Sequence, residues 1–221
     1  MYRQSKFYLL LMVTALLVSH LSALSSMNSI YAQDNYIYLP LILSPSPDTT
    51  TDFTLTSIAV SDGELLEAYK CEDKAEEDET DQAKGTEKSI PLAWSNVPDS
   101  AGSLAVIMHH YPHADDTSQV NSYLLLWAID PSVTEIPHGE ADDGDWFMGA
   151  NKDGAGVSYS SPCSPSTGIH EYTITLYALS ETPSTLPTES TKNVDYYTLI
   201  EAIGTVDTIG TAVSTFNDVT E

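Results

Sequence analysis

The sequence has very few positive charges. Its 221 residues contain eight lysines and arginines against 32 aspartates and glutamates, a formal net charge of −24, and its one arginine is Arg3. Nucleic-acid phosphates and anionic lipid surfaces repel such a chain, so partners held by bulk positive charge are excluded. A hydrophobic fraction of 42% and 13 tyrosines also exclude a disordered chain. We therefore expect one domain with a sizeable core.

The sequence also lacks an apolar run long enough for a typical membrane span. Arg3 and Lys6 precede the apolar run 7–18, and small polar residues follow it. This order is typical of a secretory signal, whereas a span needs about 20 apolar residues. We predict that residues 1–32 are a signal peptide, with Ala32 or alternatively Ala23 at the cleavage point, and that the protein is secreted or extracytoplasmic. A retained anchor is the less favoured alternative.

Beyond residue 32 the pattern indicates a linker followed by a mostly-β domain. Residues 33–52 end in a Pro- and Thr-rich stretch, which predicts an extended linker. Short β-prone runs separated by turn residues then predict a domain over 53–216, with 217–221 as a tail. We expect strands at 53–60, 103–109, 123–129, 172–179 and 208–216, and one helix at 194–203 capped by Asn193.

The segment 72–88 is an acidic insertion. It holds eight acids and three lysines, with no aromatic or branched aliphatic residue. This composition predicts a solvated surface segment. The ligand spacing and central glycine of a calcium loop are absent from it, and the acidic stretch 142–145 is interpreted as a turn.

The chain has only two cysteines, Cys71 and Cys163. In a secreted domain two cysteines favour a disulfide. The alternative is a catalytic Cys163 thiol with His170 as its base, but the sequence supplies no third group to orient the histidine.

The densest group of potential metal ligands is His109, His110 and His113. It lies at the end of a predicted buried strand. Alternation along a strand sends the first two histidines to opposite faces, so the ligand number suits zinc better than the geometry does. A metal-binding protein or metal-dependent hydrolase built on these histidines is therefore an alternative function.

A serine-hydrolase site is not indicated. Ser158 lies one residue short of the G-x-S-x-G pattern, because Ser160 replaces the second glycine. Neither a strand before it nor a helix after it is predicted, as that nucleophile would require.

The most specific signal is a proline-rich loop that leads into a clear strand. Residues 159–165 precede His170 and Tyr172, which fall on one face of the strand. Donors grouped at the end of a strand beside a stiff loop are typical of a site for a small polar or anionic ligand.

These residues resemble the phosphatidylethanolamine-binding protein family, in its bacterial Raf-kinase-inhibitor-like branch. Five segments match the family pattern in order, and the last, with G-x-N, then Y-x-x-P-C-x-P and H-x-Y, is the most specific. The segments are 53–57, 90–98, 104–114, 123–131 and 149–179. The resemblance covers about 53–216 and implies a β-sandwich-like fold, with an antiparallel central sheet, a short C-terminal helix and an anion pocket at the sheet edge.

The resemblance also implies the residues that line this pocket. The first and second aspartates of the family's D-P-D-A-P are Tyr111 and His113 here, and the family's pocket histidine is Tyr123. The two cysteines stand in loops that flank the same pocket in the family, which favours the disulfide Cys71–Cys163. The ligand-binding residues so implied are Tyr111, Pro112, His113, Tyr123, Tyr159, Pro162, Pro165, His170 and Tyr172.

From these observations we predict a secreted, non-enzymatic binding protein without a cofactor, whose ligand is a small polar or anionic group of phosphate or phospholipid-headgroup type. Once residues 1–32 are removed, no arginine remains for a bidentate clamp, so phenols, backbone N–H groups and a protonated His113 or His170 would hold the anion. Affinity should rise as the pH falls through about 6.5. Another alternative is an inhibitor or adhesion module that binds a protein through 72–88.

Overall fold

The computed structural model describes residues 52–70, 87–113, 116–152, 156–164 and 166–220. The predicted signal peptide, nearly all of the predicted linker, and most of the acidic insertion lie outside these residues. So do Cys71 and Pro165. Within the described residues, no helix is long and apolar enough to cross a membrane.

The described residues form two sheets, one short α-helix and a 3-10 turn (Glu67–Tyr69). The small sheet has the order β1-β4-β7, and the large sheet has the order β2-β3-β10-β9-β5-β6-β8. All pairings are antiparallel except that of β10 with β3. The elements are β1 (Thr54–Thr56), β2 (Val60–Ser61), β3 (Glu64–Leu65), β4 (Leu92–Ser95), β5 (Ser103–His110), β6 (Asn121–Ile129), β7 (Glu135–Ile136), β8 (Phe147–Met148), β9 (Gly168–Leu179), α1 (Tyr196–Ile203) and β10 (Thr208–Thr220).

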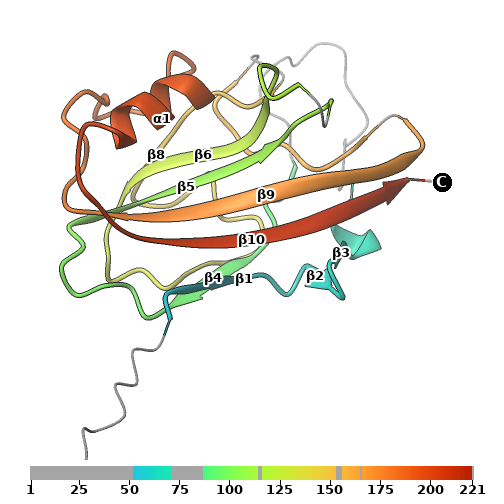
Figure 1. Cartoon of the computed structure of the whole chain (residues 1–221), viewed down its shortest axis with the longest axis horizontal. Coiled ribbons are helices and arrows are strands. Elements are labelled where there is room, and N and C mark those ends of the chain that lie inside the picture. Colours follow the sequence, from blue (N-terminus) through green and yellow to red (C-terminus); the bar gives the residue numbers. More distant parts are fainter. Residues whose placement is uncertain (1–51, 71–86, 114–115, 153–155, 165, 221) are drawn as a thin grey trace, which may run out of the picture. The chain divides into compact units, whose positions relative to one another are not determined.

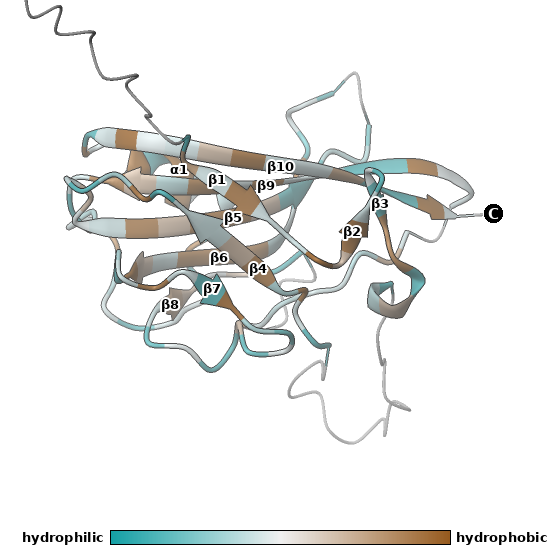
Figure 2. Cartoon of the chain, turned by 90° about the horizontal axis from the view of Figure 1, so that it is seen from below, coloured by the Kyte–Doolittle hydropathy of each residue, from teal (hydrophilic) through white to brown (hydrophobic). Residues whose placement is uncertain are grey.

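The large sheet has a core on each face. On one face, alternate residues of β5, β6 and β9 pack against the small sheet, which crosses the large one in Figure 2. On the other face, Ala105, Ile107 and Trp127 pack against α1, which Figure 1 shows on the opposite side from β1 and β4. Because both faces of β5 are covered, all eight of its residues are buried, as its continuous apolar sequence predicts. The predicted mostly-β sandwich with an antiparallel central sheet is confirmed.

Several boundaries differ from the sequence prediction: β5 ends one residue later than expected, and β6 and β9 begin earlier, at Asn121 and Gly168. The strand expected at 53–60 is split into β1 and β2, because the chain turns between them. Helix α1 begins at Tyr196, and its cap is Asp195, whose side chain accepts a hydrogen bond from the Thr198 N–H (2.8 Å). Strand β10 continues to Thr220 because it pairs with β9 throughout, so residues 217–220 belong to the sheet.

Candidate ligand-binding site

At the neighbouring ends of β5 and β9, successive side chains point alternately to the two faces of the large sheet. His110 pairs with Tyr172 in the register, and their rings stack at 4.9 Å with an interplanar angle of 22°. His109 instead contacts Tyr111 and Tyr196, with ring centroids 5.0 and 5.3 Å away. The predicted alternation of the two histidines is therefore present, and they do not converge. Among the described residues, no group of three or more His, Cys, Asp or Glu side chains could hold a metal ion.

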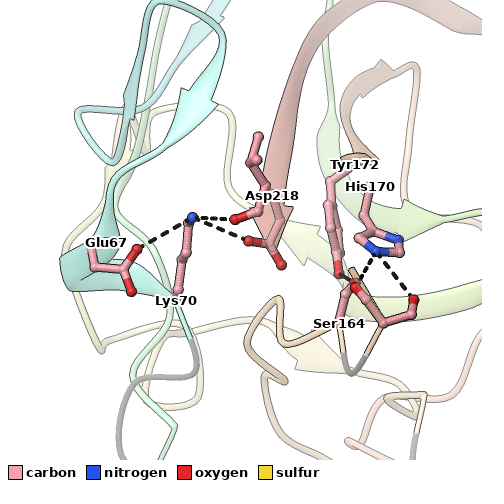
Figure 3. A network of polar contacts seen from close by, with 8 residues as sticks. Glu67, Lys70, Ser164, His170, Tyr172 and Asp218 are labelled. Atoms are coloured by element: carbon pink, nitrogen blue, oxygen red, sulfur yellow. Dashed lines mark hydrogen bonds and ion pairs between the residues drawn. The ribbon is translucent and has the colours of Figure 1, made fainter. Parts of the chain in front are cut away.

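A cluster of hydroxyl groups lies on the face that carries Tyr172. The Tyr172 Oη donates a hydrogen bond to the Tyr123 Oη (3.4 Å) and lies 3.3 Å from the Ser164 Oγ. Both tyrosines are buried, and their rings meet edge to face at 4.9 Å. Burial raises the pKa of the Tyr172 phenol, so the phenol keeps its proton for donation. Figure 3 shows Tyr172 beside Ser164 and His170. We call this group the Tyr172 cluster.

Two histidines border the Tyr172 cluster. The His110 Nδ1–H donates to the Glu171 carbonyl (2.8 Å), and the His170 Nε2–H donates to the Ser166 carbonyl (3.0 Å). Burial lowers the pKa of His110; the nearby His170 adds to this, while the Glu171 carbonyl and Asp218 oppose it. His110 is thus neutral at pH 7, and a bound anion would favour its protonation.

Charged residues that the sequence analysis did not single out also lie close by. The Lys70 Nζ is 3.5 Å from the buried Asp218 carboxylate and 3.3 Å from the Glu67 carboxylate, and it donates to the Val219 carbonyl (Figure 3). Asp218 is opposite His170 in the β9–β10 register. The Lys152 Nζ lies 5.6 Å from the centre of the Tyr123 ring. No local sequence motif marked these positions.

The loop 158–161 supplies a row of backbone donors beside the cluster. The N–H groups of Tyr159 and Ser160 donate to the Asp142 Oδ1 (2.9 Å) and to the Tyr123 carbonyl (3.0 Å). The Ser161 N–H donates to the Glu87 Oε2 (2.5 Å).

Three buried hydroxyls in the same loop make no hydrogen bond of good geometry with any residue that the structure describes: the Tyr159 Oη, Ser160 Oγ and Ser161 Oγ. The Tyr159 Oη does lie near the Ile90 backbone and the Ser161 side chain. An unsatisfied buried polar group costs about 1–3 kcal/mol, so three in sequence are unusual in a region that is purely structural. The loop is therefore a place where the acceptor atoms of a ligand would find donors.

A cavity of about 330 Å³ opens at the ends of β5 and β9. It includes Ile169, Glu171 and Thr173, which alternate with His170 and Tyr172 along β9, so much of its wall belongs to the face opposite the Tyr172 cluster. Its lining residues are His109, His110, Tyr111, Pro112, Ile169, His170, Glu171 and Thr173.

The structure brings some of the predicted pocket residues together and separates others. Tyr123, Tyr172 and His170 meet in the Tyr172 cluster, with Tyr159 and the buried Pro162 in the adjoining loop. Tyr111 lies on the other face, where its Oη is 3.3 Å from the Tyr196 Oη. Pro112 lines the cavity.

Two further candidates are accounted for by their surroundings. His113 is exposed in the loop after β5, where its carbonyl accepts from the Asp116 N–H. The Ser158 Oγ accepts a hydrogen bond from the Asn151 Nδ2 (3.2 Å), as a structural serine would.

The fold and the site together define a two-sheet β protein with a polar cluster at the end of its central strands. A family model described as phosphatidylethanolamine-binding protein matches residues 34–211, and the chain belongs to this family.

Similar proteins are found in archaea and bacteria. A UPF0098 protein of Methanothermobacter thermautotrophicus is 35% identical over 98 residues, 43% of this chain and 62% of that protein. A UPF0098 protein of Pyrococcus horikoshii is 29% identical over 118 residues, 51% of this chain and 58% of that protein. The chain thus spans less than two thirds of either relative.

Two solved structures have a similar fold. A phosphatidylethanolamine-binding protein homologue from Chlamydia trachomatis has a TM-score of 0.60 and 25% identity, and covers 77% of this chain and 99% of its own. The YbcL protein of E. coli has the same TM-score and the same coverage at 20% identity. At this identity, the similarity establishes a shared fold and nothing further.

Proposed function

We propose that this protein is a secreted, non-enzymatic binding protein that holds a small anionic ligand at the Tyr172 cluster and the loop 158–161. The ligand class is a phosphate or a phosphate monoester of headgroup type. The observation that carries the proposal is that the Tyr172 hydroxyl lies within 3.4 Å of both the Tyr123 and the Ser164 hydroxyls, beside a loop with buried hydroxyls that have no hydrogen-bond partner among the described residues. Neutral donors of this kind hold an anion where no guanidinium is available.

Electrostatics make this binding depend on pH and salt. The chain's charge of −24 opposes anion capture at long range, but salt screens distant charges beyond about 8–10 Å. Close to the ligand, a protonated His110 adds positive charge. Since burial lowers the pKa of His110, its contribution needs a pH below the ordinary 6.5. Affinity is therefore expected to rise as the pH falls.

Calorimetric titration with inorganic phosphate and with phosphoethanolamine tests the proposal at pH about 5.5 and about 7.5. We expect binding at both values, tighter at the lower one, and a loss of about tenfold or more in Tyr172→Phe, which removes the central hydroxyl. Tyr111→Phe is the matched control, because its hydroxyl lies on the other face. The absence of binding at both pH values would refute the proposal.

The location and the disulfide are part of the same proposal. Secretion is supported by the signal-like order of residues 1–32. Only Pro162 separates Cys163 from the loop 158–161, so a bond to Cys71 would tie the acidic insertion to the ligand site. N-terminal sequencing of the exported protein and peptide mapping without reduction test the two points. A retained N-terminus, or alkylation of both thiols in unreduced protein, would contradict them.

A further inference from the structure

Two backbone donors in the loop 158–161 are held by carboxylates: the Tyr159 N–H by Asp142 and the Ser161 N–H by Glu87. The Ser160 N–H pairs with a carbonyl of β6, which is a fixed part of the sheet. The Ser161 N–H pairs instead with the side chain of Glu87, the last acid of the insertion 72–88. Glu87 is half-buried at this point, so its carboxylate is partly removed from water. A backbone N–H that holds a carboxylate oxygen is also suited to hold an oxygen of another anion.

The surroundings of this contact contain more donors than one carboxylate oxygen uses. Among the described residues, the buried Tyr159 Oη and the Ser160 and Ser161 Oγ atoms have no hydrogen-bond partner of good geometry while Glu87 holds the Ser161 N–H. A tetrahedral oxyanion presents more acceptor positions in more directions than a planar carboxylate does. A phosphate that replaced Glu87 could therefore form more hydrogen bonds at this place than the Glu87 carboxylate does.

Glu87 also lies close to the proposed ligand site. Burial raises the pKa of the Tyr159 phenol, and the charges of Glu87 and Tyr172 act in the same direction, so both groups are near that phenol. The Ser160 N–H joins the same loop to Tyr123, whose hydroxyl accepts from Tyr172. The carboxylate and an anion at the Tyr172 cluster would thus face each other across a short distance, and their repulsion is strong when both are shielded from water.

We propose that Glu87 is an internal competitor of the ligand: its carboxylate occupies the Ser161 N–H in the free protein, and an anion must displace it to bind. This inference rests on the proposed function. Its consequence is that the apparent affinity is the intrinsic affinity multiplied by the fraction of molecules in which Glu87 has left the donor. The competitor also sets specificity, because a monocarboxylate ligand gains little by replacing another carboxylate.

The test compares phosphate binding by wild-type protein, Glu87→Gln and Glu201→Gln. Glu87→Gln keeps an acceptor oxygen for the Ser161 N–H but removes the charge, so the loop keeps its hydrogen bond. We expect about tenfold tighter phosphate binding, a change of about one decade in Kd. Glu201→Gln makes the same charge change at an exposed position of α1, and we expect it to bind phosphate as the wild type does.

Each outcome decides a different point. Equal Kd values for wild type and Glu87→Gln would overturn the competitor and leave the proposed function intact. Weaker binding by Glu87→Gln would show that Glu87 only positions the loop. Equal gains in the two variants would assign the effect to net charge, which also overturns the inference. If none of the three proteins binds phosphate, the proposed function itself fails.

A measurement on unmodified protein covers the case in which Glu87→Gln does not fold. In NMR spectra of wild-type protein, saturating inorganic phosphate should shift the Ser161 amide and the Glu87 carboxyl carbon together, and leave the Glu201 carboxyl carbon in place. Binding of phosphate with no shift of the Glu87 carboxyl carbon would refute the displacement.

Discussion

The two faces of the large sheet at the ends of β5 and β9 use the same residue types in opposite ways. On one face, Tyr172 is fully buried between His110 and Phe216, and its hydroxyl is paired with other hydroxyls. On the other face, Tyr196 is half-buried beside His109, which lines the cavity. The first face has a fixed set of donors, whereas the second supplies most of the cavity wall, including His109, whose buried Nδ1 has no hydrogen-bond partner among the described residues. The histidines between His109 and His113 are close in sequence, but His109 and His110 lie in separate environments on opposite faces of the sheet.

The largest expected effect compares a tyrosine from each face. Tyr172→Ala removes a ring that is 0% exposed and stacks at 5.3 Å on Phe216, so we expect a loss of about 3–5 kcal/mol in the free energy of unfolding. Tyr196→Ala removes a half-buried ring at the first turn of α1, and a loss of about 1–2 kcal/mol is expected. Urea denaturation of both variants measures the difference. Similar losses would mean that the two faces do not differ in packing.

A second prediction compares the two histidines through the pH dependence of stability. Burial lowers the pKa of both His109 and His110 below 6.5, so the unfolded chain binds more protons in the range just under that value. Stability is therefore complete above pH 6.5 and declines as the pH falls through the folded-state pKa values. For His110, the Glu171 carbonyl and Asp218 oppose the lowering, whereas for His109 the neighbouring His110 adds to it.

Denaturation curves at several pH values between about 4.5 and about 7.5 measure this decline. Because burial and the neighbouring His110 both lower the pKa of His109, whereas two contacts oppose the lowering at His110, we expect His109→Gln to remove more of the decline than His110→Gln does. A larger effect of His110→Gln would show that the face of the Tyr172 cluster, and not the cavity face, determines the acid sensitivity.

The sequence predicted those parts of the site that depend on local pattern. Alternation along β9 placed His170 and Tyr172 on one face, and the apolar run of β5 predicted a strand buried on both sides. The sequence analysis missed the charged residues of the site, because they reach it through contacts distant in sequence. Pairing of β10 with β9 brings in Asp218 and its partner Lys70, and the path of the chain before β4 brings in Glu87. No residue spacing in the sequence predicts either contact. The resemblance to relatives put Tyr111 in the pocket, but a phenol is longer than an aspartate and reaches Tyr196 on α1.

The smallest expected effect concerns α1, which belongs to the cavity face alone. The Asp195 side chain accepts from the Thr198 N–H at 2.8 Å, and this hydrogen bond lowers the pKa of its carboxyl below 3.8. Asp195→Ala should cost about 1 kcal/mol of unfolding free energy, and Asp195→Asn, which keeps an acceptor oxygen, should cost less. The cap's contribution is lost only as the pH falls below 3.8, outside the range in which the histidines act. Because the Tyr172 cluster lies on the other face, phosphate affinity should not change in Asp195→Ala; a loss measured by titration calorimetry would show that the two faces are coupled.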